Sequence, residues 1–412
     1  MRIVALWSPK IRRGLRGKSD WQRLARGISP GRPGSFRLHV HAASSGEFEQ
    51  AKPLIEALRS EGRPYRITAS FFSPSGFEQQ KGYPHIDGAC YLPHDRQGEM
   101  SEFFNWLTPD LVIIIRYDLW LEFMRQARLR RVPVVLVCGV LRSDSARFLP
   151  VIRSFFTSLY SMLAMIHAVE AADVENFRRL APKVPALVGG DTRYDRVVQR
   201  AALGLQSLPA LPGNRPILVA GSTWPADERL LEENSRRKDL LLVIVPHEPS
   251  AERIGELRSQ FQGAVTLSQL EQGAAGDPTD IDTVIVDRTG ILLDLYRIAR
   301  FAYVGGGFGD GVHSVLEAAA YGIPVLCGPA IGRSRDATAM FEAGALGVVR
   351  TTDDLSDALT RLLDEPGRIG SIGELTTRFV EARVGATERI LRALREQGLL
   401  PEREVGSEKG EG

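Results

Sequence analysis

Cysteine is scarce in this sequence. Its 412 residues contain three cysteines, Cys90, Cys138 and Cys327, which are far apart and form no C-x-x-C pair. Their number and spacing argue against a disulfide framework. Each lies beside or within an apolar run, so we predict three buried free thiols and a reducing compartment.

Long apolar runs are also missing. A transmembrane helix needs about 20 consecutive apolar residues, and the sequence has no such stretch. The apolar run at residues 3–7 is too short for a secretory signal. Apolar residues make up 43% and charged residues 25% of the chain, as in soluble globular proteins. The length predicts two domains rather than one core.

Metal-ligand spacings are absent as well. No cluster of histidines, cysteines and carboxylates has the spacing of a metal site, and we interpret the Asp282 and Asp287 pair as solvated residues at strand ends. The glycines of residues 305–311 do not fit G-x-G-x-x-G, because Asp310 or Val312 stands where the third glycine is required. This argues against a dinucleotide-dependent oxidoreductase.

Positive charge is concentrated at the start of the chain. Residues 1–40 contain ten lysines and arginines and one acid, Asp20, which gives +9, so the rest carries −7 of the net charge of +2. A short apolar tip followed by basic residues suits the anionic inner face of a membrane. The alternative is a solvated basic arm. A nucleic-acid site is disfavoured, because few aromatic residues are interleaved with these charges.

Apolar runs alternate with helical patterns along the chain. Candidate strands are residues 36–40, 67–72, 111–115, 134–137, 217–220, 240–245, 283–286, 301–304 and 324–327. This alternation predicts parallel sheets with helices on both faces. Small residues, prolines and glycines in 199–216 mark a boundary, so we predict domains at 1–200 and 201–412. The predicted fold class is α/β of the GT-B kind, with two Rossmann-like parallel-sheet domains facing a central cleft.

A glycine-rich stretch follows one of these strands. Residues 303–317 predict a strand, a glycine turn and then a helix, on which His313 and Glu317 share one face because they are four residues apart. Gly306 and Gly307 would let a ligand approach the backbone, and a helix N-terminus suits a phosphate. A nucleotide site and an ordinary strand-to-helix turn both remain open.

Loops rich in glycine, proline or polar residues follow most strands of the second half. They include residues 221–225, 246–249 and 328–329. In open α/β sheets ligands bind at the carboxyl ends of the strands, so we expect these loops to converge on one site.

Motifs spread over residues 36–345 form an ordered set. They are residues 41–50, 72–76, 91–93, 117–120, 190–197, 221–225, 246–248 and the glycine-rich stretch that ends at Glu317. Together they resemble the Kdo transferase family, in a divergent branch. Its members move 3-deoxy-D-manno-octulosonic acid (Kdo) from CMP-Kdo to a lipid A precursor, lipid IVA. The resemblance implies an inverting glycosyltransferase of lipopolysaccharide core biosynthesis that needs no metal or cofactor.

The resemblance implies three catalytic residues. Glu47, which follows a strand and Gly46, matches the glutamate that deprotonates the acceptor hydroxyl. The alternative role of Glu47 is a carboxylate that stabilises a helix N-terminus. Arg193 matches a basic residue that stabilises the departing CMP phosphate. Asp118 stands where relatives carry a glutamate, and a structural salt bridge of the nearby Arg116 is an alternative for this motif.

The resemblance also implies the substrate contacts. The candidates are Ser45, Gly46, Ser222, Thr223, Pro246, His247, Thr289, Gly290, Ile291, Gly306, Gly307, His313, Ser314, Val315, Leu316 and Glu317. Many relatives have arginine at the position of His247 and asparagine at the position of Ser314. Two donors expected at the phosphate or the cytosine are therefore replaced in this chain.

These observations predict a monomeric Kdo transferase at the cytoplasmic face of the inner membrane, attached peripherally or by a weak anchor. We expect the first domain to bind the lipid acceptor and the second to bind CMP-Kdo. A helix near residues 387–394 should return to the first domain. Two alternatives stay open: a GT-B enzyme that uses a UDP-sugar, and a non-catalytic protein that binds lipid or a sugar nucleotide.

Overall fold

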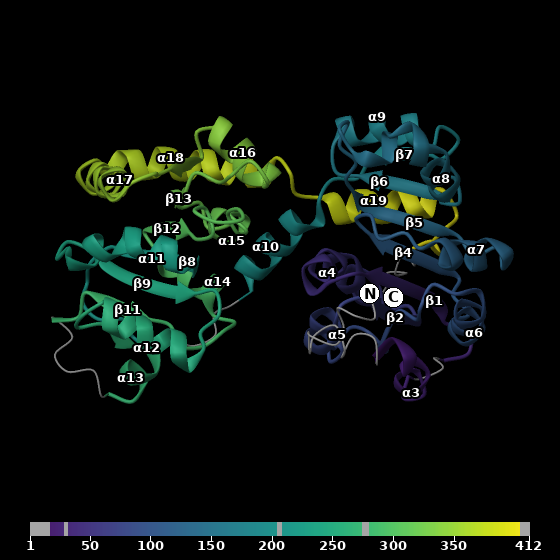
Figure 1. The fold of residues 1–412 in the computed structure, drawn as a ribbon, viewed down its shortest axis with the longest axis horizontal. Helices are drawn as coiled ribbons and strands as arrows, with labels where there is room; N and C mark the ends of the chain where they lie inside the picture. The colour runs from purple at the N-terminus through teal and green to yellow at the C-terminus, as the bar shows by residue number, and fades with distance from the viewer. Residues whose placement is uncertain (1–16, 29–31, 204–207, 274–279, 404–412) are drawn as a thin grey trace, which may run out of the picture. The chain divides into compact units, whose positions relative to one another are not determined.

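The protein is represented by a computed structural model that describes residues 17–28, 32–203, 208–273 and 280–403. It divides into two compact units, whose elements are labelled in Figure 1. Unit 1 contains the chain up to Arg196 and again from Val384, and unit 2 runs from Val197 to Arg383. The division falls inside helix α10 (Thr192–Ala202), which also contains the boundary at residue 200 drawn from the sequence.

Within the described residues, the sheet of unit 1 has seven parallel strands in the order β3-β2-β1-β4-β5-β6-β7. They are β1 (Phe36–Ala42), β2 (Tyr65–Phe71), β3 (Gly88–Tyr91), β4 (Leu111–Ile115), β5 (Val134–Gly139), β6 (Met165–Ala168) and β7 (Ala186–Val188). The four strands predicted in the first half are β1, β2, β4 and β5, which are neighbours. Every residue of β2, β4 and β5 is buried, as expected for a sheet covered on both faces.

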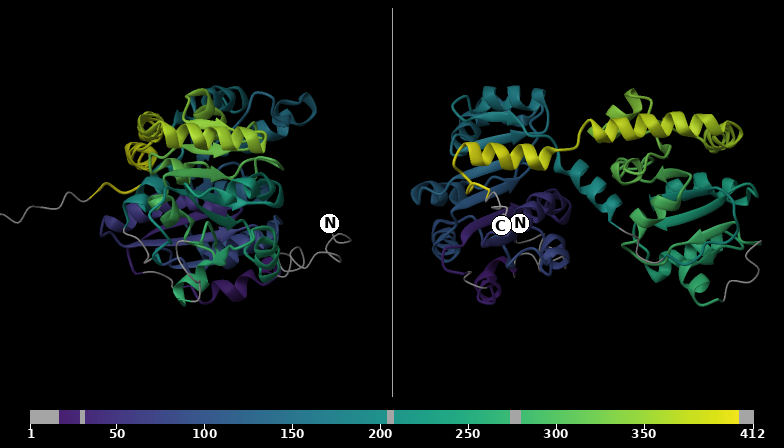
Figure 2. Two further views of the ribbon diagram at one scale, coloured as in Figure 1. Left: turned by 90° about the vertical axis from the view of Figure 1, so that its left-hand side faces the viewer. Right: turned by 180° about the vertical axis from the view of Figure 1, so that it is seen from behind.

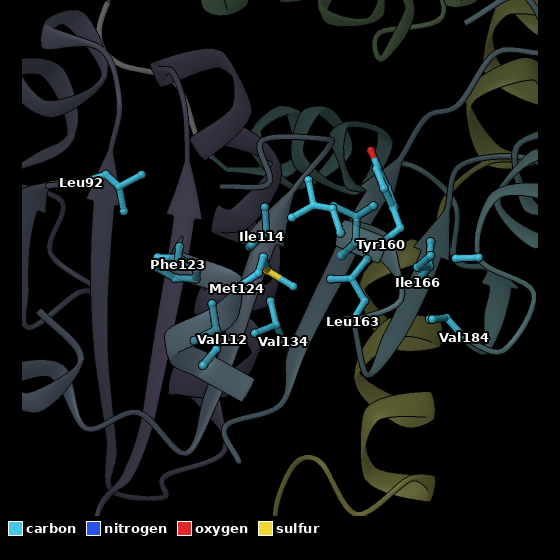
Figure 3. Close-up of a cluster of buried hydrophobic side chains, with 14 of the residues drawn as sticks. Leu92, Val112, Ile114, Phe123, Met124, Val134, Tyr160, Leu163, Ile166 and Val184 are labelled. Carbon is cyan, nitrogen blue, oxygen red and sulfur yellow. The ribbon is translucent and has the colours of Figure 1, made fainter. Parts of the chain in front are cut away.

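Helices cover both faces of this sheet. The elements are α3 (Trp21–Ala25), α4 (Ser45–Ser60), α5 (Pro74–Gln80), α6 (Gln97–Leu107), α7 (Leu121–Leu129), the 3₁₀ turn η1 (Ala146–Phe148), α8 (Pro150–Tyr160), α9 (Ala171–Leu180), α10 and α19 (Ala386–Glu396). Strand side chains alternate between the faces. Val112 and Ile114 therefore join the core that contains Phe123 (Figure 3). Ile113 joins the opposite core, which contains Leu391 of α19.

Unit 2 repeats this architecture. Within the described residues its sheet has seven parallel strands in the order β10-β11-β9-β8-β12-β13-β14. The strands are β8 (Ile217–Thr223), β9 (Leu241–Pro246), β10 (Val265–Thr266), β11 (Thr283–Ile285), β12 (Phe301–Val304), β13 (Val325–Cys327) and β14 (Leu346–Val348). The five strands predicted in the second half are β8, β9, β11, β12 and β13.

The helices of unit 2 connect these strands and include one very short element at the predicted nucleotide site. They are α11 (Pro225–Glu232), η2 (Glu233–Arg236), α12 (Ala251–Gln260), α13 (Leu267–Glu271), α14 (Leu292–Ile298), α15 (Leu316–Ala319), α16 (Arg335–Glu342), α17 (Thr352–Asp364) and α18 (Pro366–Glu381). A core that includes Leu218, Ile244 and Phe301 packs under them. The carboxyl ends of β8, β9 and β12 are adjacent, because these strands pair directly.

The three predicted free thiols are confirmed. Cys90, Cys138 and Cys327 are all buried, and none forms a disulfide. Burial raises the pKa of each thiol to about 12. Because the thiolate is the nucleophilic form, these cysteines are unreactive at neutral pH.

Helix α19 is fixed to unit 1 by polar contacts at its start. The carboxylate of Asp195, in α10, accepts hydrogen bonds of 2.6 Å from the backbone N–H groups of Gly385 and Thr387 and from the Thr387 hydroxyl. An acceptor at this place satisfies donors that an isolated helix leaves unpaired. Figure 2 shows α19, in yellow, lying along one face of the sheet.

Replacing Asp195 with alanine removes all three of these acceptor contacts. We expect the free energy of local opening of α19 to fall by about 1–3 kcal/mol. Hydrogen exchange of the backbone amides of residues 387–396, followed by mass spectrometry, measures this change as faster exchange. Asp357→Ala, at an exposed position of α17, is the control. Unchanged exchange in the Asp195 variant would mean that the apolar face alone holds α19.

Candidate active site

Glu47 lies in the first turn of α4, directly after β1. Its backbone N–H donates to Ser44 Oγ at 3.4 Å, and its own Oε2 accepts from the Ala43 N–H at 2.6 Å. The helix-stabilising role considered from the sequence is therefore present. Burial raises the pKa of Glu47, and the Ala43 N–H opposes that rise only in part. The result is a half-buried carboxylate that holds a proton more readily than an exposed one.

Asp118 ends a buried chain of hydrogen bonds that starts in the sheet. His41 Nε2 lies 2.9 Å from Asp118 Oδ2, and His41 Nδ1 lies 2.9 Å from Ser70 Oγ. His39 Nε2 is 2.8 Å from the same Ser70 Oγ, and His39 Nδ1 is 2.9 Å from Thr68 Oγ1. An ionised carboxylate only accepts, so His41 donates to Asp118 through Nε2. The chain of hydrogen bonds thus fixes the Asp118 side chain.

The charge of Asp118 is stabilised despite its burial. Burial alone would raise its pKa, but the His41 hydrogen bond and the nearby Lys18 ammonium hold the pKa below its usual value. Lys18 Nζ lies 3.2 Å from the centroid of the Phe72 ring, and Phe72 stacks on Trp120 at 5.0 Å. Burial lowers the pKa of Lys18 to about 8, and Asp118 offsets part of that shift.

Arg193 is held by a buried carboxylate two residues before it. Its Nε and Nη2 donate to Asp191 Oδ2 at 2.9 and 2.7 Å, and its backbone N–H donates to Oδ1 at 2.9 Å. Arg116 Nη2 lies 3.8 Å from the same carboxylate, so the salt bridge considered for Arg116 is present. Burial alone would raise the pKa of Asp191, but Arg193 and Arg116 hold it below its usual value.

The three predicted catalytic residues belong to one electrostatic cluster in unit 1. The Asp118 carboxylate raises the pKa of Glu47, whereas His41 and Arg116 lower it, after the larger effects of burial and Ala43. Arg116 in turn shares Asp191 with Arg193. The cluster combines a carboxylate of raised pKa, which can accept a proton, with fixed cations, which can stabilise developing negative charge.

Two predicted substrate contacts, Ser45 and Gly46, directly precede Glu47 in the chain. Ser45 Oγ accepts from Gln80 Nε2 at 2.7 Å, so its hydroxyl already has a partner. A side chain at the exposed Gly46 would meet no protein atom within 4 Å. Packing within the protein therefore does not require a glycine at this position.

In unit 2 the glycine-rich stretch packs tightly against neighbouring loops. A Cβ at Gly305 would lie 2.3 Å from the Ser222 carbonyl oxygen, and one at Gly307 would lie 2.6 Å from Gly328. Gly306 has φ of +89°, and its N–H donates to Asp227 Oδ2 at 2.9 Å. Close packing of loops thus explains these glycines without a ligand.

The helix predicted after the glycines is wrong over most of its length. Only Leu316–Ala319 is helical, and His313 is outside it, with its N–H bound to the Gly305 carbonyl oxygen at 3.0 Å. His313 and Glu317 therefore do not share a helix face, and one turn of helix provides little dipole for a phosphate. The closely packed glycine-rich stretch forms a turn at residues 307–310, and no helix begins before Leu316. Glu317 Oε1 lies 4.0 Å from Arg200 Nη1.

Three aromatic rings gather beside the glycine-rich stretch. The rings of His247 and His313 stack at 4.4 Å with 9° between their planes, and Trp224 stacks on His247 at 4.9 Å. Trp224 Nε1 donates to His313 Nε2 at 2.8 Å, so a neutral His313 carries its proton on Nδ1. Burial, followed by the neighbouring His247, lowers the pKa of His313.

Two of these rings, those of Trp224 and His313, line a cavity of about 570 Å³ within unit 2. Its lining includes Trp224, Asp227, Arg229, Gly306, Asp310 and His313. A cavity of this size, with one large aromatic side chain and a few polar groups, is typical of small-molecule sites. Trp224 and Asp227 were not among the residues predicted for the site, although Trp224 lies in the 221–225 motif.

The remaining predicted contacts fall into four groups. Ser222 (φ of +54°) and Thr223, whose Oγ1 donates to Glu228 Oε1 at 2.9 Å, end β8. Pro246 lines an adjoining cavity of about 240 Å³. Thr289, Gly290 and Ile291 lie between β11 and α14 and are not among the residues that line either cavity. Ser314 is exposed, whereas Val315 and Leu316 are buried, so those two can offer a ligand little but backbone.

The described residues contain no group of three or more histidines, cysteines or carboxylates that could hold a metal ion.

Comparison with known proteins supports the resemblance to Kdo transferases. A family model described as 3-deoxy-D-manno-octulosonic-acid transferase (kdotransferase) matches residues 18–196. The 3-deoxy-D-manno-octulosonic acid transferase of Haemophilus influenzae is 27% identical over 87% of this chain and 86% of its own length. The enzyme of the same name from Bordetella pertussis is 27% identical over 94% of this chain and 95% of its own length. The chain is therefore similar to Kdo transferases over most of its length.

Solved structures support the fold class predicted for this chain. The UDP-GlcNAc 2-epimerase of Neisseria meningitidis, bound to UDP-GlcNAc, superimposes with a TM-score of 0.59 at 14% identity, over 87% of this chain and 99% of that chain. Similarity at this level shows the fold alone. The predicted α/β class, with two Rossmann-like parallel-sheet domains of the GT-B kind, is confirmed.

The raised pKa of Glu47 generates a pH prediction. If Glu47 is the base, the transfer rate falls as pH decreases through its pKa, because the protonated carboxyl cannot accept a proton. Asp118→Asn removes a negative charge that raises this pKa, so the acidic limb of the pH–rate profile should move to lower pH. Glu78→Gln, at an exposed ion pair, should leave the limb in place. If the acidic limb does not move in the Asp118 variant, a group other than Glu47 controls it.

Proposed function

We propose that this chain transfers Kdo from CMP-Kdo to a lipid A precursor, lipid IVA, in lipopolysaccharide core biosynthesis. The observation that carries the proposal is the similarity to the Bordetella pertussis Kdo transferase, which spans 94% of this chain and 95% of that enzyme. The electrostatic cluster around Glu47 supports the same chemistry from the structure.

In the proposed reaction Glu47 removes the proton of the acceptor hydroxyl. The acceptor oxygen forms a bond to the anomeric carbon of Kdo, while the bond from that carbon to the phosphate oxygen breaks. CMP leaves with the electron pair of that bond, and the proton stays on Glu47. Attack from the face opposite to CMP inverts the anomeric carbon, which requires one base rather than two carboxylates in succession.

Arg193 is proposed to stabilise the negative charge that develops on the departing CMP. An arginine stays charged at all physiological pH values. The bond network with Asp191 fixes its guanidinium, so little reorganisation is needed during the reaction. Asp118, fixed by His41, is proposed to position the acceptor through one of its carboxylate oxygens.

The donor is proposed to bind in unit 2, in the cavity beside Trp224 and His313. The His313 Nδ1–H is a suitable donor for a phosphate or sugar oxygen, and the ring of Trp224 is 42% exposed. Of the other predicted contacts of unit 2, Gly306 lines this cavity, and Thr223 and Pro246 line the adjoining one. We propose that the reaction uses no metal or other cofactor.

The site of action is proposed to be the cytoplasmic face of the inner membrane, where a monomer reaches its lipid acceptor from the surface. No helix in the described ranges is long and apolar enough to span a bilayer. Residues 1–16, which include half of the ten basic residues at the start of the chain, lie outside the described residues. Of the others, Lys18 belongs to the candidate active site and Arg37 pairs with Asp110.

Replacing Glu47 with glutamine tests the catalytic proposal. The amide keeps the size of the side chain but cannot take the proton, so Kdo transfer should fall by at least about 100-fold. Mass spectrometry of the lipid A precursor after incubation with CMP-Kdo measures the added Kdo. Glu78→Gln serves as the matched control and should transfer normally. Equal product from the Glu47 variant and the wild type would reject Glu47 as the base, and no product from either would favour a non-catalytic binding protein.

Calorimetric titration with nucleotides tests the donor. We expect CMP to bind and UDP to bind at least about tenfold more weakly, since a Kdo transferase must select the cytidine nucleotide. His313→Gln should weaken CMP binding about tenfold, the effect of losing one hydrogen bond to a charged group. His85→Gln, at an exposed position of unit 1, is the control. Tight UDP binding without CMP binding would instead support a GT-B enzyme that uses a UDP-sugar.

A further inference from the structure

One segment of unit 1 exposes an unusual amount of apolar surface. Leu149, Val151, Ile152 and Phe155 have exposed fractions of 55%, 91%, 36% and 47%. Soluble proteins rarely leave several large apolar side chains exposed together. We call these four residues the α8 surface.

The residues of the α8 surface are neighbours, and the packing of the core does not account for their exposure. Val151 and Phe155 are four residues apart on α8, and Ile152 and Phe155 are three apart, so these side chains are neighbours on the helix. The helix is anchored through its last turn, where Leu159 and Tyr160 are its buried residues. Its first two turns therefore direct their apolar side chains outward, the reverse of an ordinary surface helix.

Three arginines lie close to the α8 surface in the sequence. Between residues 142 and 155 there are three arginines and one acid, a balance of +3 − 1 = +2. Arg142 pairs with the exposed Asp144 at 2.9 Å, and Arg153 Nη2 donates to the Arg179 carbonyl oxygen at 3.1 Å. Arg147 lies over the Phe156 ring at 5.5 Å. Apolar side chains with a basic rim fit a surface that is apolar inside and negatively charged at its edge.

The same segment adjoins the candidate active site. The guanidinium of Arg147 also lies 6.0 Å from the centroid of the Tyr117 ring, which is 44% exposed. Tyr117 is bonded directly to Asp118 in the chain. The α8 surface is thus connected, through one arginine and one tyrosine, to the residue proposed to position the lipid acceptor.

We propose that the α8 surface inserts into the interface of an anionic phospholipid bilayer, with Arg142, Arg147 and Arg153 among the headgroups. The apolar side chains enter the boundary of the acyl chains, and the arginines contact lipid phosphates. This inference rests on the proposed function, because a lipid acceptor must be taken from a membrane. It assigns the contact to a helix in the middle of unit 1 and not to the basic start of the chain.

Vesicle sedimentation of the full chain tests this assignment. The probe is a vesicle of phosphatidylethanolamine with phosphatidylglycerol, and it needs neither donor nor acceptor. We expect the double variant Val151→Asp, Phe155→Asp to reduce the bound fraction at least about fivefold, because charge disfavours insertion. Leu375→Asp, which changes an apolar side chain of α18 that is 37% exposed, is the matched control and should sediment like the wild type. Circular dichroism confirms that both variants remain folded.

A fluorescent variant reports insertion without disrupting the surface. In Phe155→Trp the new indole should shift to shorter wavelength with vesicles and be quenched by brominated acyl chains, whereas Leu375→Trp should show neither change. Normal sedimentation of the aspartate double variant, together with an unquenched Phe155→Trp, would overturn the proposal. So would a wild-type dimer that the double variant dissociates without any change in vesicle binding, since the surface would then bind a second copy.

The vesicle results separate this inference from the proposed function. If the wild type binds vesicles through α8 but transfers no Kdo, the proposed function fails and the membrane surface stands. If Kdo transfer is normal and vesicle binding does not depend on α8, the membrane surface fails and the proposed function stands.

Discussion

The buried carboxylate of Asp191 is the interaction on which the candidate active site depends. Its side chain is 2% exposed, and a charge so far from water persists only when it is paired. Arg193 binds it through two nitrogens and Arg116 approaches it from the sequence motif that contains Asp118. One carboxylate thus positions two cations, and the second of them acts on the pKa of Glu47. Removing Asp191 would release both arginines and alter the base indirectly, so effects of changes at these four residues should not be additive.

The sequence was informative where physical constraints are local. Strands at or near the sheet centres, such as β4 and β12, are buried on both faces and are therefore continuous apolar runs that can be read directly. The strands that were missed include the four edges β3, β7, β10 and β14, which have two to four residues each. Segments of that length are too short to show the apolar pattern of a strand. They form strands because they pair with a neighbouring strand, which the sequence does not reveal. The ordered motifs indicated the resemblance to Kdo transferases, which 27% identity over most of the chain supports.

The site was predictable only in part, for the same reason. Motifs placed Glu47, Asp118 and Arg193 in one domain, but no pattern indicated that Lys18, far away in sequence, lies on the Phe72 ring beside Asp118. Trp224 was visible as a motif residue, yet its stacking on His247 requires the ends of β8 and β9 to be adjacent. The helix expected at His313 failed because close packing of glycines against other loops, and not helix propensity, determines the backbone there.

The glycine contacts in unit 2 limit how the donor site can diversify. Gly305 touches the Ser222 carbonyl, Gly307 touches Gly328, and no other residue leaves room for these approaches. Three loops from β8, β12 and β13 are consequently interlocked through backbone alone, and a substitution in one of them disturbs the others. If this cavity holds the donor, changes in nucleotide preference would therefore fall on the side chains beside this frame, such as Trp224, His247 and His313. Substitutions meant to change which nucleotide binds would have to be made at these same positions.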